Sequence, residues 1–244
     1  MNFIFKSILM ALHLLLAVIL CIAMIMLPRK IRSILIQHWA KRLLRILKIK
    51  ITLSGEVLNF LSKDSYLVVS NHISWLDIPV IFSLKPITFV SASDVKIWPI
   101  IGMLAKISGA IFVDRNRKSS LVEVIQAMNH HFKNQKQSIC IFPEGITSNG
   151  YQVLPFKSNL FQSAYEANKL LLPLSIQYKE NNVITNRTSF HGSISLFQSF
   201  KRIAQSNHIE VFLDIGHPVK SSQSRKLLSV KLQEAIAQKI RTNF

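Results

Sequence analysis

The residues with the clearest chemical potential are a histidine and an aspartate five positions apart in VSNHISWLDIPV, residues 69–80. A carboxylate that accepts a hydrogen bond from one imidazole nitrogen fixes the ring tautomer and leaves the other nitrogen free to take a proton. His72 could therefore act as a general base oriented by Asp77, and correct placement of such a base is worth about 10²- to 10⁴-fold in rate. No G-x-S-x-G motif accompanies the pair, so the hydroxyl that loses the proton would belong to a substrate.

Each residue of this pair also has a plainer structural explanation. Asp77 comes just before Ile78 and Pro79, and because proline is well tolerated in the first turn of a helix, Asp77 could be a helix N-cap. His72 by itself would more often be a loop histidine whose hydrogen bonds are satisfied locally. Only the two residues together indicate an acid–base site.

The elements that must position this pair follow from residue 49 onward, where short runs of β-branched residues alternate with helix-like segments. The runs span residues 49–53, 66–70, 87–91, 110–113, 138–142, 171–178 and 209–215. The helix-like segments lie near residues 78–84, 96–107, 119–134, 157–168, 196–206 and 222–241. This order predicts an α/β domain with a mixed, largely parallel sheet flanked by helices. Ligands of such sheets gather where strands end, and Asn71 and His72 directly follow one of the runs.

The first 48 residues have the composition of a membrane attachment. Residues 7–27 are apolar apart from Ser7 and His13, and as a helix at about 1.5 Å per residue they would extend roughly 31 Å, which matches a bilayer core. The next segment, RKIRSILIQHWAKRLLRILKIK, predicts a basic amphipathic helix at the membrane interface, with Trp39 at the level of the headgroups. We therefore divide the chain into an anchor with a basic helix, residues 1–48, and a globular domain, residues 49–244. The pattern leaves open whether the first segment crosses the bilayer or folds back with the second in one leaflet.

The charge of the chain points to anionic partners. The formal net charge is +18, and residues 1–50 contain nine Lys or Arg and no Asp or Glu. Such a field attracts anionic membranes, phosphorylated substrates or nucleic acid. Because the basic segment adjoins the apolar one, we favour lipid over nucleic acid as its partner. The cations follow the apolar run, so the positive-inside rule predicts an inner or cytoplasmic membrane with the domain facing the cytoplasm.

The remaining cysteine and histidine residues do not suggest a metal or disulfide framework. Cys21 and Cys140 are too few for either, and both lie in apolar runs, so we predict two buried thiols. His130 and His131 are adjacent in a helix-like segment without a matching carboxylate or thiolate. We predict that they lie on the surface and that the protein has no metal site.

Two further stretches contain polar residues at the ends of predicted strands. GAIFVDR, residues 109–115, ends in Arg115, whose guanidinium could clamp a phosphate with two hydrogen bonds, although such an arginine is usually a surface ion. IFPEGITSNGYQVLPFKSNLF, residues 141–161, contains Glu144 and Gly145, and a glycine there would allow close approach of the backbone to a ligand. By itself this second stretch is an ordinary turn.

Four stretches in order, NHISWLD, GAIFVDR, FPEG and LLPLSIQY, resemble the sequence blocks of the glycerolipid acyltransferases, a family that includes the 1-acyl-glycerol-3-phosphate acyltransferases. The resemblance covers about residues 50–216. It implies that His72 and Asp77 form a catalytic dyad that deprotonates the free hydroxyl of a lysolipid. The oxygen would then attack the thioester of acyl-CoA or acyl-carrier protein, without a bound cofactor. The residues implied on the acceptor side are Arg115, Glu144, Gly145, Thr147 and Lys157, and those elsewhere in the site are Asn71, Ser74, Gly109, Pro143 and Pro173.

Two departures from the family pattern bear on the acceptor. Members that act on lysophosphatidate commonly have F-P-E-G-T-R-S, with the arginine on the acceptor phosphate, whereas this chain has Ile146 and Thr147 at those positions. Many members also have a phosphate-binding lysine where this chain has Ala92. The missing cations favour a lysophospholipid with a substituted headgroup or a lyso-ornithine lipid, although Arg115 and Lys157 could compensate and retain 1-acyl-glycerol-3-phosphate as acceptor. The alternative in a different class is a protein that binds anionic lipid or nucleic acid without chemistry.

Overall fold

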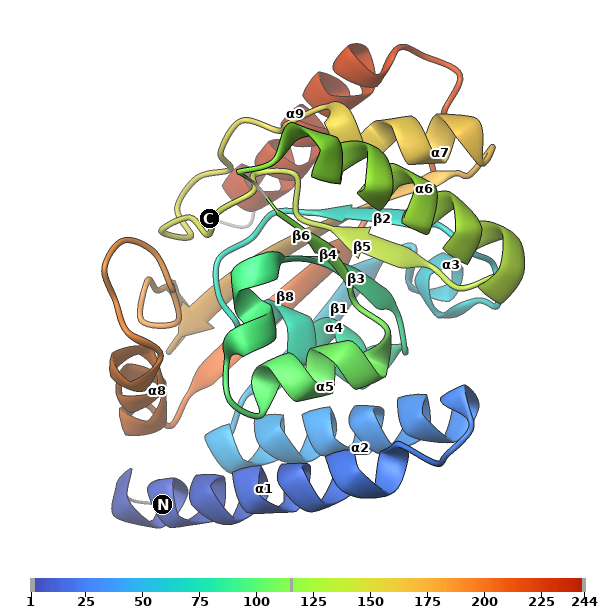
Figure 1. Ribbon diagram of the computed structural model, residues 1–244. Coiled ribbons are helices and arrows are strands. Elements are labelled where there is room, and N and C mark those ends of the chain that lie inside the picture. The colour runs from blue at the N-terminus through green and yellow to red at the C-terminus, as the bar shows by residue number, and fades with distance from the viewer. Residues whose placement is uncertain (1–2, 115, 243–244) are drawn as a thin grey trace.

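The structure, a computed structural model, describes residues 3–114 and 116–242. Within these residues eight strands form one sheet in the order β1-β8-β6-β2-β5-β3-β4, with β7 paired to β6 (Figure 1). The neighbours in this order are parallel except that β6 is antiparallel to both β8 and β7. The prediction of a mixed, largely parallel sheet is therefore confirmed. The strands are β1 Lys50–Gly55, β2 Leu67–Ser70, β3 Thr88–Ala92, β4 Ile111–Val113, β5 Ile139–Ile141, β6 Leu171–Glu180, β7 Val183–Ile184 and β8 Ile209–Ile215.

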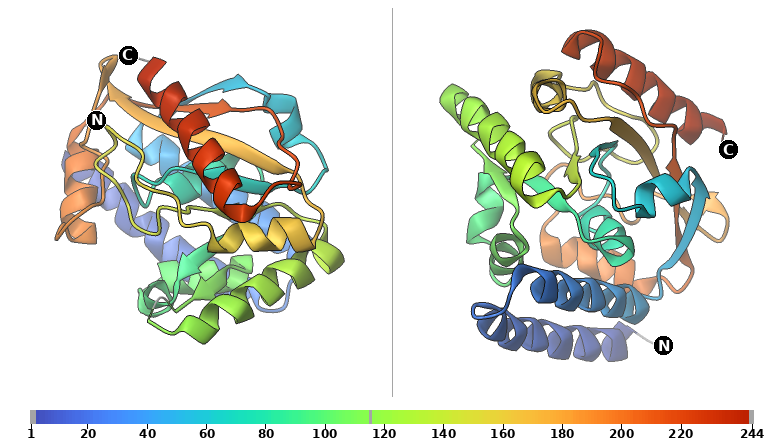
Figure 2. Two further views of the ribbon diagram at one scale, coloured as in Figure 1. Left: turned by 90° about the horizontal axis from the view of Figure 1, so that it is seen from above. Right: turned by 90° about the vertical axis from the view of Figure 1, so that its right-hand side faces the viewer.

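Helices cover both faces of this sheet (Figure 2). On one face lie α4 Asp77–Leu84 and α5 Ile101–Ser108, and on the other lie α6 Lys118–Gln135, α7 Gln162–Glu166 and α9 Arg225–Thr242. The remaining helices are α3 Val57–Leu61 and α8 Leu196–Gln205. Successive residues of β2 point to opposite faces, so Val68 packs into one core cluster and Leu67 and Val69 into the other. Because β2 is buried on both sides, it is apolar until it ends at Ser70.

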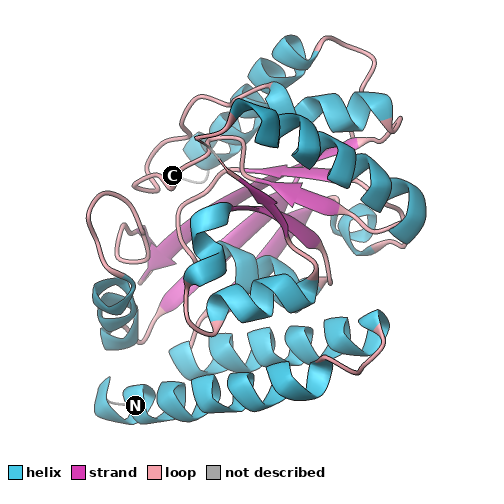
Figure 3. Ribbon diagram, viewed as in Figure 1, coloured by secondary structure: helices cyan, strands magenta, loops and turns pink. Residues whose placement is uncertain are grey.

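Proline breaks one of the predicted helices. The segment predicted as a helix over residues 96–107 is divided into a short 3-10 turn, η1 Ser93–Ile97, and α5 (Figure 3). Trp98 has φ −68° and ψ 127°, the extended backbone favoured before a proline, and Pro99 follows it. A second predicted helix, over residues 157–168, is likewise a 3-10 turn, η2 Asn159–Phe161, followed by α7. Helix α3 and strand β7 were not predicted.

The N-terminal segments form a helical hairpin along one side of the domain (Figure 1). It consists of α1 Phe3–Met24 and α2 Arg29–Leu47. Helix α1 contacts α2, α5 and α8, so it runs alongside the protein instead of projecting from it. By length and composition α1 is sufficient to span a membrane, and 28% of its most apolar window is buried inside the protein. Its outward side presents a row of exposed apolar side chains: Ile4, Ile8, Leu12, Leu15, Ile19 and Ile22.

Helix α2 is amphipathic as predicted, but its apolar face packs on the domain. Leu43 and Leu47 are buried in the core cluster that also contains Val80 of α4. Trp39 is half-buried and stacks on His13 of α1 with ring centroids 4.7 Å apart, so this ring joins the two helices, and its place among lipid headgroups stays a prediction. The apolar stripe of α2 finds its partner in α4 and α1, and residues 1–48 consequently share one hydrophobic core with residues 49–244.

The two thiols and the adjacent histidines can also be compared with prediction. Cys21 and Cys140 are both free and buried, as expected. His130 is exposed, but His131 is only 4% exposed, so its assignment to the surface is wrong. His131 follows Val124 and Met128 at positions i+7 and i+3, which places it on the buried face of α6. Burial, together with the positive charges of Arg29 and His130, lowers the pKa of the His131 ring to about 4.

Candidate active site

The loop between β2 and α4 brings His72 and Asp77 into contact. The Nδ1–H group of His72 donates to Oδ2 of Asp77 at 2.7 Å, which leaves Nε2 as the free ring nitrogen. The Asp77 side chain is fully buried, and that of His72 is 18% exposed. Asp77 is not the N-cap of α4, because that position is Leu76, which makes no capping hydrogen bond. Instead Asp77 Oδ2 accepts from the backbone N–H groups of Ile73 and Ser74, at 2.8 and 3.0 Å, and folds the loop back on itself.

Sequence reasoning missed the residue that binds the second oxygen of this carboxylate. The hydroxyl of Tyr178, on β6, donates to Oδ1 of Asp77 at 2.7 Å. Tyr178 lies two residues after Ile176 and four after Leu174 on the same buried face of the strand. The signal was available, since a tyrosine at the end of an apolar strand needs a hydrogen-bond partner when it is buried.

Two of the predicted site residues support His72 through its backbone. The Asn71 side chain donates to the carbonyl of Ile176 at 2.9 Å and accepts from its N–H at 2.8 Å, so it continues the pairing of β2 with β6 beyond Ser70. Glu144 Oε1 accepts from the His72 N–H at 2.7 Å, and Oε2 accepts from the Leu154 N–H at 3.0 Å. Both side chains are buried and hydrogen-bonded to backbone groups, and they therefore hold the backbone of the loop that carries His72.

Glu144 carries the largest electrostatic perturbation near the pair. Burial raises the pKa of its carboxyl group to about 7, and the nearby Asp77 charge acts in the same direction. The hydrogen bonds from the His72 and Leu154 N–H groups lower that pKa, but burial outweighs them. The group thus changes charge near neutral pH while remaining directly behind the histidine.

The other residues expected on the acceptor side lie at different depths. Gly145 and Thr147 line the cavity described below, and the Thr147 hydroxyl donates to the Phe190 carbonyl. Lys157 is exposed, and its Nζ lies 3.0 Å from the position that a Cβ on Gly145 would occupy. Arg115 lies outside the described residues.

The predicted residues elsewhere in the site have structural positions. Ser74 is buried in the turn before α4, where its hydroxyl accepts from the Leu76 N–H at 3.2 Å. Pro143 accepts from the Lys157 N–H at 2.9 Å and so closes the loop after β5. Gly109 ends α5 with a φ of 82°, between two residues that line the cavity described below, Ser108 and Ala110, and Pro173 is buried in β6 opposite Val69.

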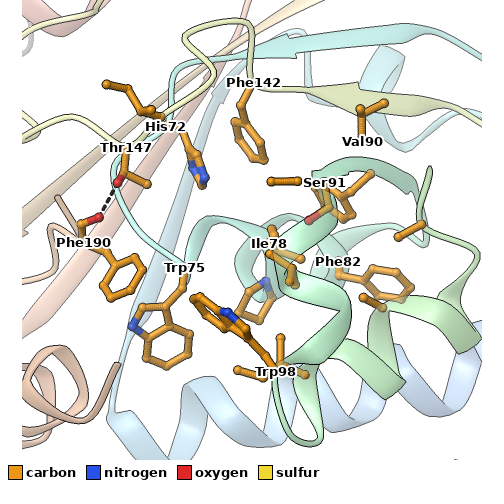
Figure 4. A pocket seen from close by; sticks show the side chains of 18 of the residues that line it. His72, Trp75, Ile78, Phe82, Val90, Ser91, Trp98, Phe142, Thr147 and Phe190 are labelled. Atoms are coloured by element: carbon orange, nitrogen blue, oxygen red, sulfur yellow. Dashed lines mark hydrogen bonds between the residues drawn. The ribbon is translucent and has the colours of Figure 1, made fainter. Parts of the chain in front are cut away.

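A cavity of about 800 Å³ extends from His72 toward the N-terminal hairpin. Figure 4 shows the His72 ring pointing into this space between Phe142, Thr147 and Trp75. The ring stacks on Phe142 with centroids 4.0 Å apart and planes 14° from parallel, which limits its rotation. The apolar walls come from α2, α4, β3 and α5, with Ile36, Leu43, Ile78, Phe82, Val90 and Leu104 among the lining side chains. Among the described residues that line it there is no Lys or Arg.

A held imidazole beside an apolar cavity suits the deprotonation of a hydroxyl on an amphipathic substrate. Residues 48–177, slightly more than half of the chain, match the family model described as Acyltransferase. The chain belongs to the acyltransferase family. The matched range includes His72, Asp77 and Glu144 and ends one residue before Tyr178.

Named relatives and a solved structure agree with this membership of the acyltransferase family. The chain is 31% identical over 208 residues to a lyso-ornithine lipid O-acyltransferase of Pseudomonas aeruginosa, covering 84% of this chain and 78% of that protein. It is 28% identical over 175 residues to a 1-acyl-sn-glycerol-3-phosphate acyltransferase of Neisseria gonorrhoeae, covering 71% and 68% of the two chains. The crystal structure of the 1-acyl-sn-glycerophosphate acyltransferase PlsC from Thermotoga maritima has the same fold, with a TM-score of 0.74, 20% identity, and coverage of 98% of this chain and 93% of that one.

Proposed function

We propose that this acyltransferase moves a fatty acyl group from a thioester donor, acyl-CoA or acyl-carrier protein, to the free hydroxyl of a lysolipid. The observation that carries the proposal is the His72–Asp77 hydrogen bond in the wall of an apolar cavity bordered by α2. The names of the two relatives support a lysolipid as acceptor, since both act on single-chain lipids. The cavity is large enough for an aliphatic chain to bring its polar end to the imidazole.

The proposed reaction needs no covalent enzyme intermediate. His72 Nε2 takes the proton of the acceptor hydroxyl as its oxygen attacks the thioester carbonyl, forming the new C–O bond. The C–S bond then breaks, and the proton passes from the imidazolium to the departing thiolate, which leaves as the free thiol of the donor. Asp77 keeps Nδ1 protonated throughout and stabilises the positive charge that develops on the ring.

The lining of the cavity supports an acceptor other than a phosphomonoester. Such a group is normally bound by Lys or Arg side chains, and the described lining residues include neither. Ala92 and Thr147, which stand where many relatives have a lysine and an arginine, are both among these lining residues, as is Ile146 beside Thr147. We therefore propose a lyso-ornithine lipid or a lysophospholipid with a substituted headgroup as the preferred acceptor.

We further propose that α1 inserts along one leaflet and does not cross the bilayer. A spanning helix would leave the body of the protein, whereas α1 lies against α2, α5 and α8. Its exposed apolar row, which includes Ile8 and Leu15, would enter the acyl region, and the exposed cations of α2 would contact lipid phosphates. The membrane would then be the inner or cytoplasmic one, with the cavity on the cytoplasmic side.

An acceptor panel tests the proposed function. Purified protein is incubated in lipid vesicles with each of three lysolipids, namely lyso-ornithine lipid, lysophosphatidylethanolamine and lysophosphatidate, and with acyl-CoA or acyl-carrier protein as donor. We expect transfer to the first or second acceptor at a higher kcat/KM than to lysophosphatidate. A strong preference for lysophosphatidate would refute the inference from the cavity lining, and no transfer to any acceptor would refute the function itself.

A further inference from the structure

The Asp77 carboxylate is held by four donors, of which only one is the histidine. Oδ2 accepts from His72 Nδ1 and from the Ile73 and Ser74 N–H groups, and all three belong to the same loop. Oδ1 accepts from Tyr178, which comes from the centre of the sheet, 101 residues away in sequence. The tyrosine is therefore the donor that fixes this loop carboxylate relative to the rigid part of the fold.

The surroundings of Tyr178 keep its hydroxyl a neutral donor. The residue is 1% exposed, and burial, followed by the Asp77 charge and the hydrogen bond to it, raises the pKa of the phenol well above its ordinary value. A tyrosine in this position is shielded from bulk solvent and keeps its proton over the whole pH range of an assay. Its strand also holds the residue before the histidine, because Ile176 binds the Asn71 side chain.

We propose that Tyr178 is a positioning residue of the dyad, whose hydroxyl fixes the orientation of Asp77 so that Oδ2 remains directed at His72 Nδ1. The inference rests on the proposed acyl transfer for its catalytic consequence. While Tyr178 donates to Oδ1, the negative charge of the Asp77 carboxylate is stabilised partly by this hydroxyl and only partly by the imidazole. Without the donor, the full charge acts on the imidazole, so that the protonated ring is favoured and less neutral base is present at a given pH.

Among the described residues, the other titratable groups near the pair are Glu144, Cys140, and the two that line the cavity with His72, Asp94 and His191. Glu144 lies behind the His72 N–H, and the Cys140 thiol on β5 is close enough to Asp77 to experience its charge. Burial, and to a smaller extent Asp77, raises the pKa of the Cys140 thiol well above its ordinary value, so this group stays neutral. Glu144 changes charge near pH 7, and all of these groups are present equally in the variants compared below.

The test compares Tyr178→Phe with Tyr66→Phe in the full-length protein. Tyr66 is a matched control, since it is 4% exposed and its hydroxyl donates to a carboxylate outside the dyad, that of Asp64, at 3.5 Å. For Tyr178→Phe we expect kcat to fall by about 10- to 100-fold, the range for a lost hydrogen bond to a charged group, with little change in KM for the lysolipid. The acid limb of its pH–rate profile should move to higher pH, and Tyr66→Phe should leave both unchanged.

Two further measurements separate a positioning role from loss of structure. In an Asp77→Asn background, adding Tyr178→Phe should lower kcat by a much smaller factor than in the wild type, because the hydroxyl acts through the carboxylate. If Tyr178→Phe does not fold, 3-fluorotyrosine at position 178 retains the packing and makes a stronger donor, and it should move the acid limb to lower pH.

A titration of His72 followed by nuclear magnetic resonance gives a readout that does not depend on turnover. In Tyr178→Phe the midpoint of this titration should move to higher pH, and in Tyr66→Phe it should not. If the midpoint moves to higher pH but the wild-type protein acylates no lysolipid, the proposed function is refuted and the positioning role is still supported. The inference is overturned if the midpoint does not move or if kcat is unchanged in Tyr178→Phe. It is also overturned if Tyr178→Phe lowers kcat by the same factor in the wild-type and Asp77→Asn backgrounds.

Discussion

Glu144 offers the sharpest test of the electrostatics behind the dyad. Burial raises the pKa of its carboxyl group from 4.5 to about 7 in the folded protein. The folded state thus retains a proton between pH 4.5 and pH 7 that the unfolded chain has already released. Stability falls with rising pH wherever the folded state binds more protons, so this group should destabilise the protein progressively across that interval. The difference in pKa corresponds to a loss of at most about 3 kcal/mol, complete above pH 7.

The substitution Glu144→Gln removes this titration and retains the shape of the protonated acid. At low pH the two proteins should have similar stability, because a protonated glutamate and a glutamine both offer one good acceptor to the His72 and Leu154 N–H groups. As the pH rises from 5 to 8, the free energy of unfolding of the variant should increase relative to that of the wild type by up to about 3 kcal/mol. Comparing the two proteins at each pH cancels the contributions of all other titrating groups.

The measurement is unfolding by urea in detergent micelles at several pH values from 3 to 8, so that the range includes the titration of both glutamates. Glu180→Gln serves as a control of opposite sign, because against the effect of burial, hydrogen bonds from Ser206 and Arg187 lower the pKa of Glu180. That variant should lose stability relative to the wild type as the pH rises from the acid side. If the free energy of unfolding of Glu144→Gln also falls relative to the wild type as the pH rises, the two backbone hydrogen bonds outweigh burial in setting the pKa of Glu144. The reasoning about Glu144 would then be refuted.

Three other predictions concern activity and membrane binding. His72→Ala should lower acyl transfer by about 10²- to 10⁴-fold while vesicle association stays unchanged, and unaltered turnover would exclude a general base at this position. Ala92→Lys combined with Thr147→Arg adds two cations to the cavity lining. The kcat/KM for lysophosphatidate, divided by that for lyso-ornithine lipid, should therefore rise at least about tenfold. A constant ratio would show that these positions do not contact the headgroup. Leu15→Glu, on the exposed row of α1, should reduce co-sedimentation with vesicles, whereas Val183→Glu at an exposed site of β7 should not; equal binding by both would mean that α1 does not enter the bilayer.

The sequence was sufficient for the order of strands and helices because the hydrophobic pattern is local. The β2 segment is apolar from Leu67 to Val69, as expected of a strand buried on both faces, and its end at Ser70 marks the start of the site. The division of one helix at Pro99 also had a local cause that the pattern contained. The helical period placed Val124 and Met128 on the same face of α6 as His131, so its burial could have been read from the spacing.

The roles within the site depended on contacts that no local pattern encodes. The resemblance placed Glu144 on the acceptor, but both its oxygens bind backbone N–H groups of the protein. It also placed Pro173 in the site, and in the structure this residue pairs with Val69 of β2, three residues before His72. Tyr178 reaches Asp77 only because β6 lies beside β2 in a particular register, and register between distant strands is a tertiary property.

The arrangement of the helices links attachment to the membrane with the shape of the site. Helix α2 packs on α4, and α4 begins at Asp77, so the surface that carries the exposed cations is one layer away from the dyad. The same helix contributes Ile36 and Leu43 to the wall of the cavity. A hairpin held against a bilayer would therefore present the cavity to the layer in which single-chain lipids reside, with His72 at its inner end. The apolar stripe of α2 closes the cavity, which explains why the first 48 residues share a core with the remainder, and it leaves the exposed apolar row of α1 for the lipid contact that we propose.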